Sequence, residues 1–314
     1  MNRRTLLECS VLWSACLLTG CTVGQYARML IKQDTTYGKV NEAITGSSKQ
    51  LIDRKAISAA RRYTMPDGVE IDVWIRKAKP DTEPLGTVLV LHGLCDSKAT
   101  HLKLGQLLSE KGFDVVLPDL RAHGRSTGEY VTFGALEKQD QKRVMDALLK
   151  EKVIREPLYV FGADLGGSVA ILYAAIDPRV QGVMAVAPSR DMRSMCRRFF
   201  SRNAILLNEQ QFEKVIAEAG QIGRFDPSEA SALDAAPKLR CPLLLVHSKV
   251  DLLVDFSDSQ ALHAAAGGPK ELEVITFLDH FGVVFGREPS IVKGVEKVAS
   301  GRLTATTQPA PEEQ

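Results

Sequence analysis

Short runs made mostly of apolar residues recur along most of this chain, separated by stretches in which apolar residues follow a helical spacing. An apolar run without alternation is typical of a strand that is buried on both faces, as in a parallel sheet. The runs occupy residues 87–91, 113–117, 158–161, 183–187, 243–246 and 272–277, and the helical stretches occupy 102–110, 136–151, 167–175 and 256–266. Strands that alternate with helices predict an α/β fold class, a doubly wound and mostly parallel sheet.

Two regions depart from that alternation. Residues 62–65 and 69–77 flank the turn Pro66-Asp67-Gly68, which predicts an antiparallel hairpin. The connection between the runs at 183–187 and 243–246 is about fifty residues long, too long for a simple crossover. It includes a helix-like stretch at 209–219, so we predict a small helical lid over about 189–240. The domain is expected to span 61–300, and the polar residues 301–314 to form a flexible tail.

The composition is that of an ordinary globular protein. Of 314 residues, 45% are hydrophobic and 25% charged, which excludes a disordered chain and a membrane protein with many spans. The 40 basic residues nearly balance the 38 acidic ones. This near neutrality gives no electrostatic footprint for nucleic acid, so no nucleic-acid partner is expected.

The amino terminus has the pattern of a secretory signal. Arg3 and Arg4 precede an apolar run at 11–18 that is too short to span a bilayer. The run ends in Leu18-Thr19-Gly20-Cys21, which resembles the lipobox of bacterial lipoproteins. That resemblance implies cleavage after residue 20, lipidation of Cys21 with palmitate as one of the acyl groups, and an exported protein anchored to a membrane of a bacterial cell envelope. Residues 21–60 would then serve as a tether and approach segment. An ordinary signal peptide with a chance cysteine is the alternative.

The turn after the run at 158–161 is unusually rich in small residues. It reads Gly162-Ala163-Asp164-Leu165-Gly166-Gly167 and leads directly into an apolar helix. A sharp strand-to-helix turn needs small neighbours, because its central residue is held in a strained conformation that lifts one side chain above the sheet edge. This segment resembles the nucleophile elbow of the α/β-hydrolase superfamily, with Asp164 in place of the usual serine.

The resemblance extends over roughly residues 60–300. His92-Gly93-Leu94 matches the superfamily's oxyanion loop, which implies that the amides of Leu94 and Leu165 form the oxyanion hole. Asp251 and His280 occupy the positions of the catalytic acid and base, and the order Asp164, Asp251, His280 is that of this superfamily. The sequence as a whole is most similar to the esterase and acyl-peptidase branches of this superfamily. Asp255 is a rival of Asp251 for the acid.

A second match is architectural. The segment Asp119-Leu120-Arg121-Ala122-His123-Gly124-Arg125-Ser126 resembles the family's Asp-X-Arg-Gly-His-Gly-X-Ser loop, so His123 is not expected to be catalytic. Ser168 lies one helical turn beyond the elbow, too late for the nucleophile. Cys95, beside the oxyanion loop, is interpreted as a packing residue rather than a second nucleophile. Cys95, Cys196 and Cys241 allow at most one disulfide.

An aspartate at the elbow changes the chemistry that is available. A carboxylate is already anionic at neutral pH, and its attack on a saturated carbon gives a stable alkyl ester, whereas its attack on an acyl carbon gives a reactive anhydride. This is the logic of haloalkane dehalogenases and epoxide hydrolases. The leaving-group donors of those enzymes have no match, because Leu165 stands where dehalogenases place tryptophan and the lid region contains no tyrosine.

We therefore expect a hydrolase that acts on a small organic ester or related substrate through Asp164, Asp251 and His280, with no cofactor and no metal. The nucleophilic residue could instead act as a base for water. The alternative from another class is a ligand-binding or scaffold protein on a hydrolase fold, in which Asp164 is only a turn residue. The lid arginines could bind a carboxylate or phosphate of the substrate, meet anionic lipid, or form a solvated face; they are Arg190, Arg193, Arg197, Arg198 and Arg202.

Overall fold

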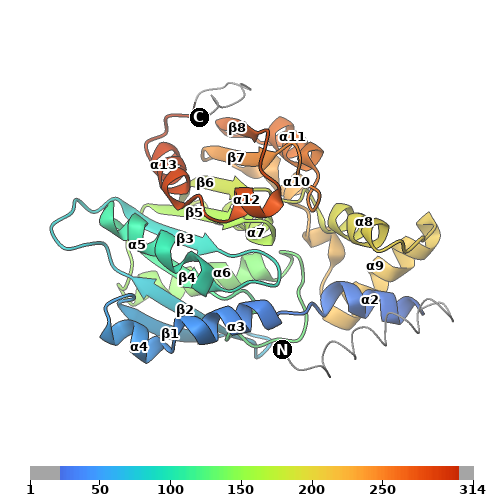
Figure 1. Cartoon of the computed structure of the whole chain (residues 1–314), viewed down its shortest axis with the longest axis horizontal. Coiled ribbons are helices and arrows are strands. Elements are labelled where there is room, and N and C mark those ends of the chain that lie inside the picture. Colours follow the sequence, from blue (N-terminus) through green and yellow to red (C-terminus); the bar gives the residue numbers. More distant parts are fainter. Residues whose placement is uncertain (1–21, 304–314) are drawn as a thin grey trace.

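A computed structural model describes residues 22–303 and contains one sheet with helices on both faces (Figure 1). The strands lie in the order β1-β2-β4-β3-β5-β6-β7-β8. β1 and β2 form the predicted antiparallel hairpin, β2 is also antiparallel to β4, and all other neighbours are parallel. The strands are β1 (Ala59–Thr64), β2 (Glu70–Arg76), β3 (Gly86–Leu91), β4 (Phe113–Pro118), β5 (Leu158–Ala163), β6 (Val180–Val186), β7 (Leu243–Ser248) and β8 (Lys270–Ile275). The predicted doubly wound fold class is confirmed.

The flanking helices are α5 (Leu102–Glu110), α6 (Glu137–Lys150), α7 (Leu165–Ala174), α11 (Phe256–Ala265), α12 (His280–Val284) and α13 (Glu288–Ala299). The strands between β2 and β8 are almost entirely apolar because both of their faces are covered. Val88 and Val90 of β3 join the core on the side of α5 and α13, whereas Leu89 and Leu91 join the core on the side of α6 and α7. The first five predicted runs therefore correspond to strands whose alternate side chains enter two cores. The sixth, 272–277, overlaps the half-buried edge strand β8, and Phe277 lies beyond that strand and is exposed.

The long connection after β6 forms the expected helical region. α8 (Met192–Arg202) and α9 (Glu209–Gly223) project to one side of the sheet in Figure 1, and the short helices η2 (Pro227–Glu229), α10 (Ala232–Ala235) and η3 (Ala236–Lys238) lead back to β7. Asp191 caps α8 by accepting a hydrogen bond from the Ser194 amide, and Asn208 forms a capping box with Gln211 at the start of α9.

The segment that we expected to act as a tether is folded against the domain. Residues 22–55 form α2 (Val23–Ile31), α3 (Thr36–Thr45) and α4 (Ser48–Asp53). α2 lies along α9 (Figure 1), and its residues Ala27, Leu30 and Ile31 are completely buried. α3 packs against η1 (Lys98–His101), which follows the predicted oxyanion loop. This segment is therefore part of the structural unit that surrounds the site.

Several sequence predictions fall outside the described residues, namely the signal at 1–20, the lipidation site Cys21 and the tail beyond residue 303. Within residues 22–303, no helix is long and apolar enough to cross a membrane. Cys95, Cys196 and Cys241 are all free thiols, so the described part of the chain contains no disulfide.

Candidate active site

Asp164 occupies the turn between β5 and α7 with the backbone geometry of a nucleophile elbow. Its φ of 53° and ψ of −121° lie outside the favoured regions for a residue with a side chain. The neighbouring glycines make this turn possible, because a Cβ atom on Gly162 would lie 2.0 Å from the Gly166 carbonyl oxygen. A Cβ on Gly166 would lie 2.4 Å from the Leu91 carbonyl oxygen. The small residues of the motif therefore allow β5, α7 and β3 to meet at the turn.

The Asp164 carboxylate points into the predicted oxyanion hole. The backbone amide of Leu94 donates a hydrogen bond of 2.8 Å to Asp164 Oδ2. Gly93 allows this approach, because a Cβ at that position would lie only 3.0 Å from the same oxygen. Leu165, at the first position of α7, is buried, but within residues 22–303 its amide donates no hydrogen bond to that carboxylate. One of the two predicted donors thus contacts Asp164 directly.

Asp251 and His280 form a hydrogen-bonded pair at the carboxyl end of the sheet. His280 Nδ1 lies 2.7 Å from Asp251 Oδ2, and Asp251 Oδ1 accepts from the amides of Leu253 and Val254 at 2.8 and 2.9 Å. Burial alone would raise the pKa of Asp251, but hydrogen bonds from His247 and His280 hold it well below its usual range. Asp251 is therefore an anion that accepts at both oxygens and orients the imidazole.

His280 is buried, and its pKa is raised above the ordinary value. Burial opposes this shift, but the hydrogen bond to Asp251 and the negative charges of Asp164 and Asp251 outweigh it. The described atoms give no direct hydrogen bond between His280 and Asp164, although both side chains line one cavity. The rival acid, Asp255, instead caps α11 through the Ser257 amide and pairs with Arg198.

His247 is a buried partner of the acid that the sequence did not single out. Its Nε2 lies 3.4 Å from Asp251 Oδ2 and 3.2 Å from the Val254 carbonyl oxygen. Its Nδ1 lies 2.7 Å from Ser259 Oγ. An Nε2–H tautomer satisfies both ends, donating toward Asp251 and Val254 and accepting from Ser259. The sequence signal is only that His247 precedes Asp251 by four residues on the same strand and loop.

The cavity above Asp164 measures about 480 Å³. Asp96 and His280 are buried and Asp164 is half-buried, so these three polar residues form its floor. Its apolar lining comes from α8, α12 and the loops beside them. The full lining is Gly93, Leu94, Cys95, Asp96, Asp164, Met195, Arg198, Phe199, Arg202, Asn203, Leu253, Val254, His280, Phe281, Val284 and Phe285. Apolar walls around a few convergent polar groups are typical of a small-molecule site.

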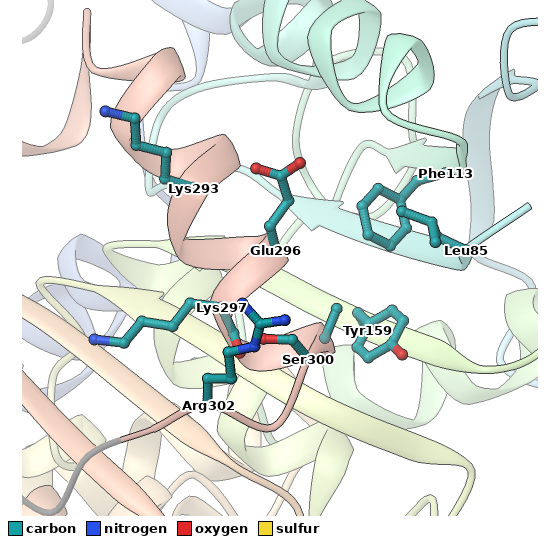
Figure 2. A pocket seen from close by; sticks show the side chains of 9 residues that line it. Leu85, Phe113, Tyr159, Lys293, Glu296, Lys297, Ser300 and Arg302 are labelled. Atoms are coloured by element: carbon teal, nitrogen blue, oxygen red, sulfur yellow. The ribbon is translucent and has the colours of Figure 1, made fainter. Parts of the chain in front are cut away.

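A second hollow of about 570 Å³ lies at the opposite end of the sheet. Figure 2 shows it between α13 and the starts of the strands, lined by Phe113, Tyr159, Lys293, Glu296 and Arg302 among others. Phe113 is the first residue of β4 and Tyr159 the second of β5, whereas Asp164 follows the end of β5. Ligands of open α/β sheets bind at the carboxyl ends of the strands, so the cavity above Asp164 is the candidate active site.

Asp96 is a second carboxyl group in that cavity. It is 3% exposed, and its Oδ2 has no hydrogen-bond partner among the described residues. Burial raises its pKa to about 6, even though hydrogen bonds from Thr100 and Ser97 oppose the shift. Asp96 therefore holds a proton more readily than an ordinary aspartate. The sequence analysis did not identify Asp96 as a candidate site residue.

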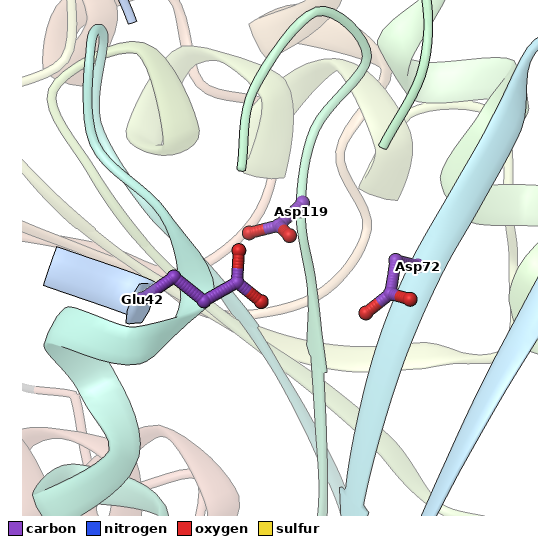
Figure 3. A group of neighbouring side chains, drawn as sticks. All are labelled: Glu42, Asp72 and Asp119. Carbon is purple, nitrogen blue, oxygen red and sulfur yellow. The ribbon is translucent and has the colours of Figure 1, made fainter. Parts of the chain in front are cut away.

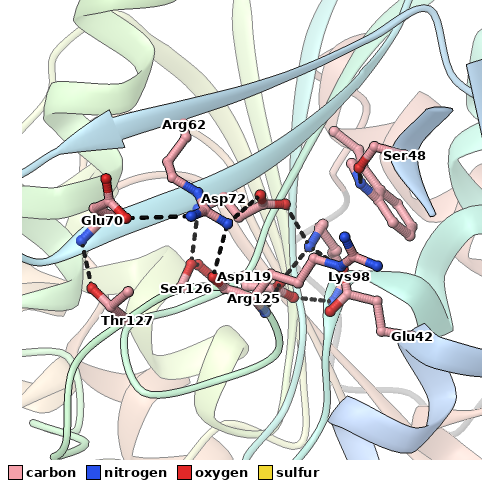
Figure 4. A network of polar contacts seen from close by, with 11 residues as sticks. Glu42, Ser48, Arg62, Glu70, Asp72, Lys98, Asp119, Arg125, Ser126 and Thr127 are labelled. Atoms are coloured by element: carbon pink, nitrogen blue, oxygen red, sulfur yellow. Dashed lines mark hydrogen bonds and ion pairs between the residues drawn. The ribbon is translucent and has the colours of Figure 1, made fainter.

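A buried ionic network around Lys98 lies next to the oxyanion loop. Figure 3 shows the carboxylates of Glu42, Asp72 and Asp119 converging, with one oxygen of each within 4.8 Å of the others. This is a spacing that could hold a cation, and the Lys98 ammonium occupies that position (Figure 4). Lys98 Nζ lies 2.6 Å from Glu42 and 2.9 Å from Asp72, and it also contacts Asp119. The three carboxylates are therefore a structural site for lysine.

Glu42 brings the amino-terminal segment into this network. It belongs to α3 and also pairs with Arg125 at 3.1 Å. Close by, the Gly38 amide of α3 donates a hydrogen bond of 3.2 Å to the Cys95 carbonyl oxygen. A Cβ on Gly38 would lie 2.4 Å from the carbonyl oxygen of Asp96. α3 thus packs directly on the loop that presents the Leu94 amide.

The remaining candidates have structural contacts. His123 Nε2 accepts from the Cys95 amide, and His92 Nε2 accepts from the Leu120 amide, so both imidazoles join backbone segments. Ser168 Oγ donates to the carbonyl oxygen of Ser189. Burial, together with the charge of Asp164, raises the pKa of the Cys95 thiol to about 12, so the reactive thiolate is suppressed at neutral pH.

Comparison with known proteins identifies the family of this fold. The family model for the alpha/beta hydrolase fold matches residues 86–255, more than half of the chain. The chain belongs to the alpha/beta hydrolase fold family. That match includes the Leu94 loop, the Asp164 elbow and Asp251.

Individual relatives of this family member are distant. Protein YqkD of Bacillus subtilis is 24% identical over 233 residues, covering 69% of this chain and 72% of its own. A monoacylglycerol lipase of Mycolicibacterium smegmatis is 27% identical over 191 residues, covering 60% and 62%. Among solved structures, the esterase Pf2001 of Pyrococcus furiosus superposes with a TM-score of 0.62 at 22% identity, covering 81% and 94%. This hydrolase fold is therefore shared with esterases at low sequence identity.

Proposed function

We propose that this family member hydrolyses a small organic ester or related substrate through Asp164 as a covalent nucleophile. The observation that carries the proposal is the hydrogen bond from the Leu94 amide to Asp164 Oδ2, which fixes one oxygen and leaves Oδ1 to attack. The related lipase and esterase named above support an ester as the substrate class.

The first step forms a bond between Asp164 Oδ1 and a saturated carbon of the substrate, and the bond from that carbon to the leaving group breaks. The leaving group departs with the electron pair, which leaves an alkyl ester on Asp164. Attack at a saturated carbon fits a carboxylate better than attack at an acyl carbon, since the latter would give an anhydride. Asp96 supports this step as the buried acid of the same cavity, where it could protonate a departing oxygen.

The second step uses His280. Neutral His280 takes a proton from water, and the resulting hydroxide attacks Cγ of the Asp164 ester. The carbonyl electrons move onto Oδ2, where the Leu94 amide stabilises the oxyanion. When the tetrahedral species collapses, the alcohol leaves with the proton from His280, and Asp164 becomes a carboxylic acid that contains one oxygen from water. That acid then releases its proton to solvent through His280, which restores the Asp164 carboxylate. Asp251 orients the imidazole and stabilises its charged form.

Single turnover in heavy-oxygen water tests this proposal. With protein in excess over substrate, the label is expected in the Asp164 carboxylate, where peptide mass spectrometry locates it. Labelled product together with unlabelled Asp164 would reject the covalent route and leave Asp164 as a base for water.

The alternative is a ligand-binding protein on a hydrolase fold, and one observation favours it. Asp164 itself occupies the Leu94 amide, so a substrate carbonyl cannot use that donor without displacing the carboxylate. The variant Asp164→Ser separates the two functions. Ester hydrolysis that is present in the variant and absent from the native chain would favour the binding protein, whereas alkyl-group transfer to native Asp164 would exclude it.

We also propose anchoring of the exported chain through a lipidated Cys21. The sequence pattern supports it, together with the start of α2 at Val23, which would hold the anchor close to α9. Labelling with a palmitate analogue in a bacterial host is expected to modify the native chain and to be lost in Cys21→Ala.

A further inference from the structure

The lid arginines differ in whether they have an acidic partner. Arg193 pairs with Glu213 at 2.8 Å, Arg197 with Glu209 at 2.6 Å and Arg190 with Asp258 at 3.4 Å. Arg198 pairs with Asp255. Among the residues that the structure describes, Arg202 contacts no carboxylate, and its one polar contact is Nη1 donating to the Leu252 carbonyl oxygen at 3.4 Å.

The two arginines nearest the end of α8 are also the two that line the cavity above Asp164. Arg198 and Arg202 are four residues apart on one helix, so they lie on the same face. Arg193 and Arg197 point instead toward α9, where their glutamate partners lie. The lid therefore divides its cations between a structural face and a cavity face.

The cavity has a polar floor, apolar walls and a cationic rim. Asp96 and Asp164 lie at the floor, and the side chains of Phe199, Phe281 and Phe285 form part of the walls. Arg202 is exposed at the rim, and four of its five N–H donors have no partner in the described part of the chain. An anionic group would gain both charge pairing and hydrogen bonds there, whereas near the floor the aspartates would repel it.

We propose that Arg202 binds a carboxylate or phosphate group of the substrate at the cavity face of α8, which it shares with Arg198, the partner of Asp255. The substrate class is then an amphiphilic organic anion whose charged end lies at the rim, whose apolar stem lies along the phenylalanines, and whose reacting carbon lies at Asp164. This inference rests on the proposed function for its reacting end, but the anion site itself can be tested by binding alone.

Binding of short alkyl ligands to the full chain provides the test. Hexanoate, hexyl phosphate and the uncharged 1-hexanol are titrated calorimetrically into the native protein, Arg202→Ala, Arg202→Lys and Arg197→Ala. The Arg197 variant removes the same charge from the same helix but leaves the cavity intact. Hexanoate or hexyl phosphate should bind the native protein at least 10-fold more tightly than 1-hexanol, and whichever binds more tightly identifies the anion.

Arg202→Ala is expected to lose that 10-fold preference, Arg202→Lys to keep part of it, and Arg197→Ala to keep it fully. Equal binding of the anions and 1-hexanol to the native protein, or an equal loss in Arg197→Ala, would overturn the proposal. Vesicles of phosphatidylglycerol distinguish a lipid surface as the source of the anion: vesicle binding that weakens equally in both alanine variants, without soluble-anion binding, would contradict the cavity site. None of these measurements depends on labelling of Asp164. The anion site can therefore be rejected while the covalent route is retained, and the covalent route can be rejected while the anion site is retained.

Discussion

The Leu94 amide donates to the carboxylate of Asp164, 70 positions along the chain, at 2.8 Å. In a serine hydrolase, the equivalent N–H group is available to donate to the carbonyl oxygen of the substrate. Here it binds an oxygen of Asp164 itself, and in the proposed mechanism the same N–H would stabilise that oxygen when hydroxide attacks the ester on Asp164. The replacement of serine by aspartate is therefore compatible with a working oxyanion hole, provided that Asp164 attacks a saturated carbon of the substrate and not a carbonyl carbon.

Asp164→Asn tests the charge of the proposed nucleophile with almost no change of shape. The amide keeps an oxygen that can accept from Leu94, but it is a poor nucleophile, so turnover is expected to fall at least about 1000-fold. The thermal midpoint should change little, because the variant side chain fills the same space. Turnover within about 10-fold of the native value would contradict a covalent role.

His280→Gln is expected to trap the intermediate. The first step needs no base, whereas the second needs His280 to activate water. The variant should therefore release one equivalent of leaving group and stop, and intact-mass spectrometry should show the alkyl group on the peptide containing Asp164. A variant that releases no leaving group at all would place His280 in the first step instead.

The pH dependence of turnover should follow the protonation of His280. In the free protein the hydrogen bond to Asp251 and the charges of Asp164 and Asp251 raise the pKa of His280 above its ordinary value. In the alkyl-enzyme the charge of Asp164 is neutralised, so kcat, which reports the second step, should decline as pH falls through a value below the pKa of His280 in the free protein. The first step needs no base, so kcat/KM should show no inflection from His280. Asp251→Asn should shift the inflection of kcat to lower pH and reduce kcat, because it removes the charge that favours the imidazolium. An unshifted inflection would exclude His280 as the titrating base.

The sequence singled out the parts of this candidate site that belong to contiguous segments. Asp164 could be found because its small neighbours are required by close backbone approaches within one turn. Asp251 and His280 could be found because each follows a recognisable strand. Lys98 and Gly38 could not be found from the sequence, because their roles depend on α3 lying against the oxyanion loop. A local sequence pattern does not predict where an amphipathic helix will pack. The arginines of α8 were visible as a group, but which of them face the cavity depends on the glutamates of α9.

Lys98→Met should be strongly destabilising. It would leave the carboxylates of Glu42, Asp72 and Asp119 buried together without their cation, and breaking a buried ionic cluster in this way costs about 3–5 kcal/mol. Lys103→Met is the matched control, since that lysine is exposed on α5, and it should change the free energy of unfolding by no more than about 0.5 kcal/mol. Urea unfolding measures both. In Lys98→Ala, added Ca²⁺ should recover part of the loss by binding the vacated carboxylates, with no effect on the native chain.

A pair of glycine variants tests whether the amino-terminal segment positions the oxyanion loop. In Gly38→Ala the new Cβ would lie 2.4 Å from the Asp96 carbonyl oxygen, so α3 or the loop must move. We expect a loss of about 1–3 kcal/mol in unfolding free energy and a fall in kcat of about 10-fold, as the Leu94 amide shifts from Asp164. Gly24→Ala makes the same change in α2, where the nearest atom lies at 3.5 Å, and should stabilise the protein by about 0.5 kcal/mol through helix propensity without altering kcat. A shift of the Leu94 amide by a few tenths of an ångström weakens its hydrogen bond to Asp164, on which the proposed second step depends. If Gly38→Ala lost stability but kept the native kcat, α3 would therefore support the fold without positioning the Leu94 amide.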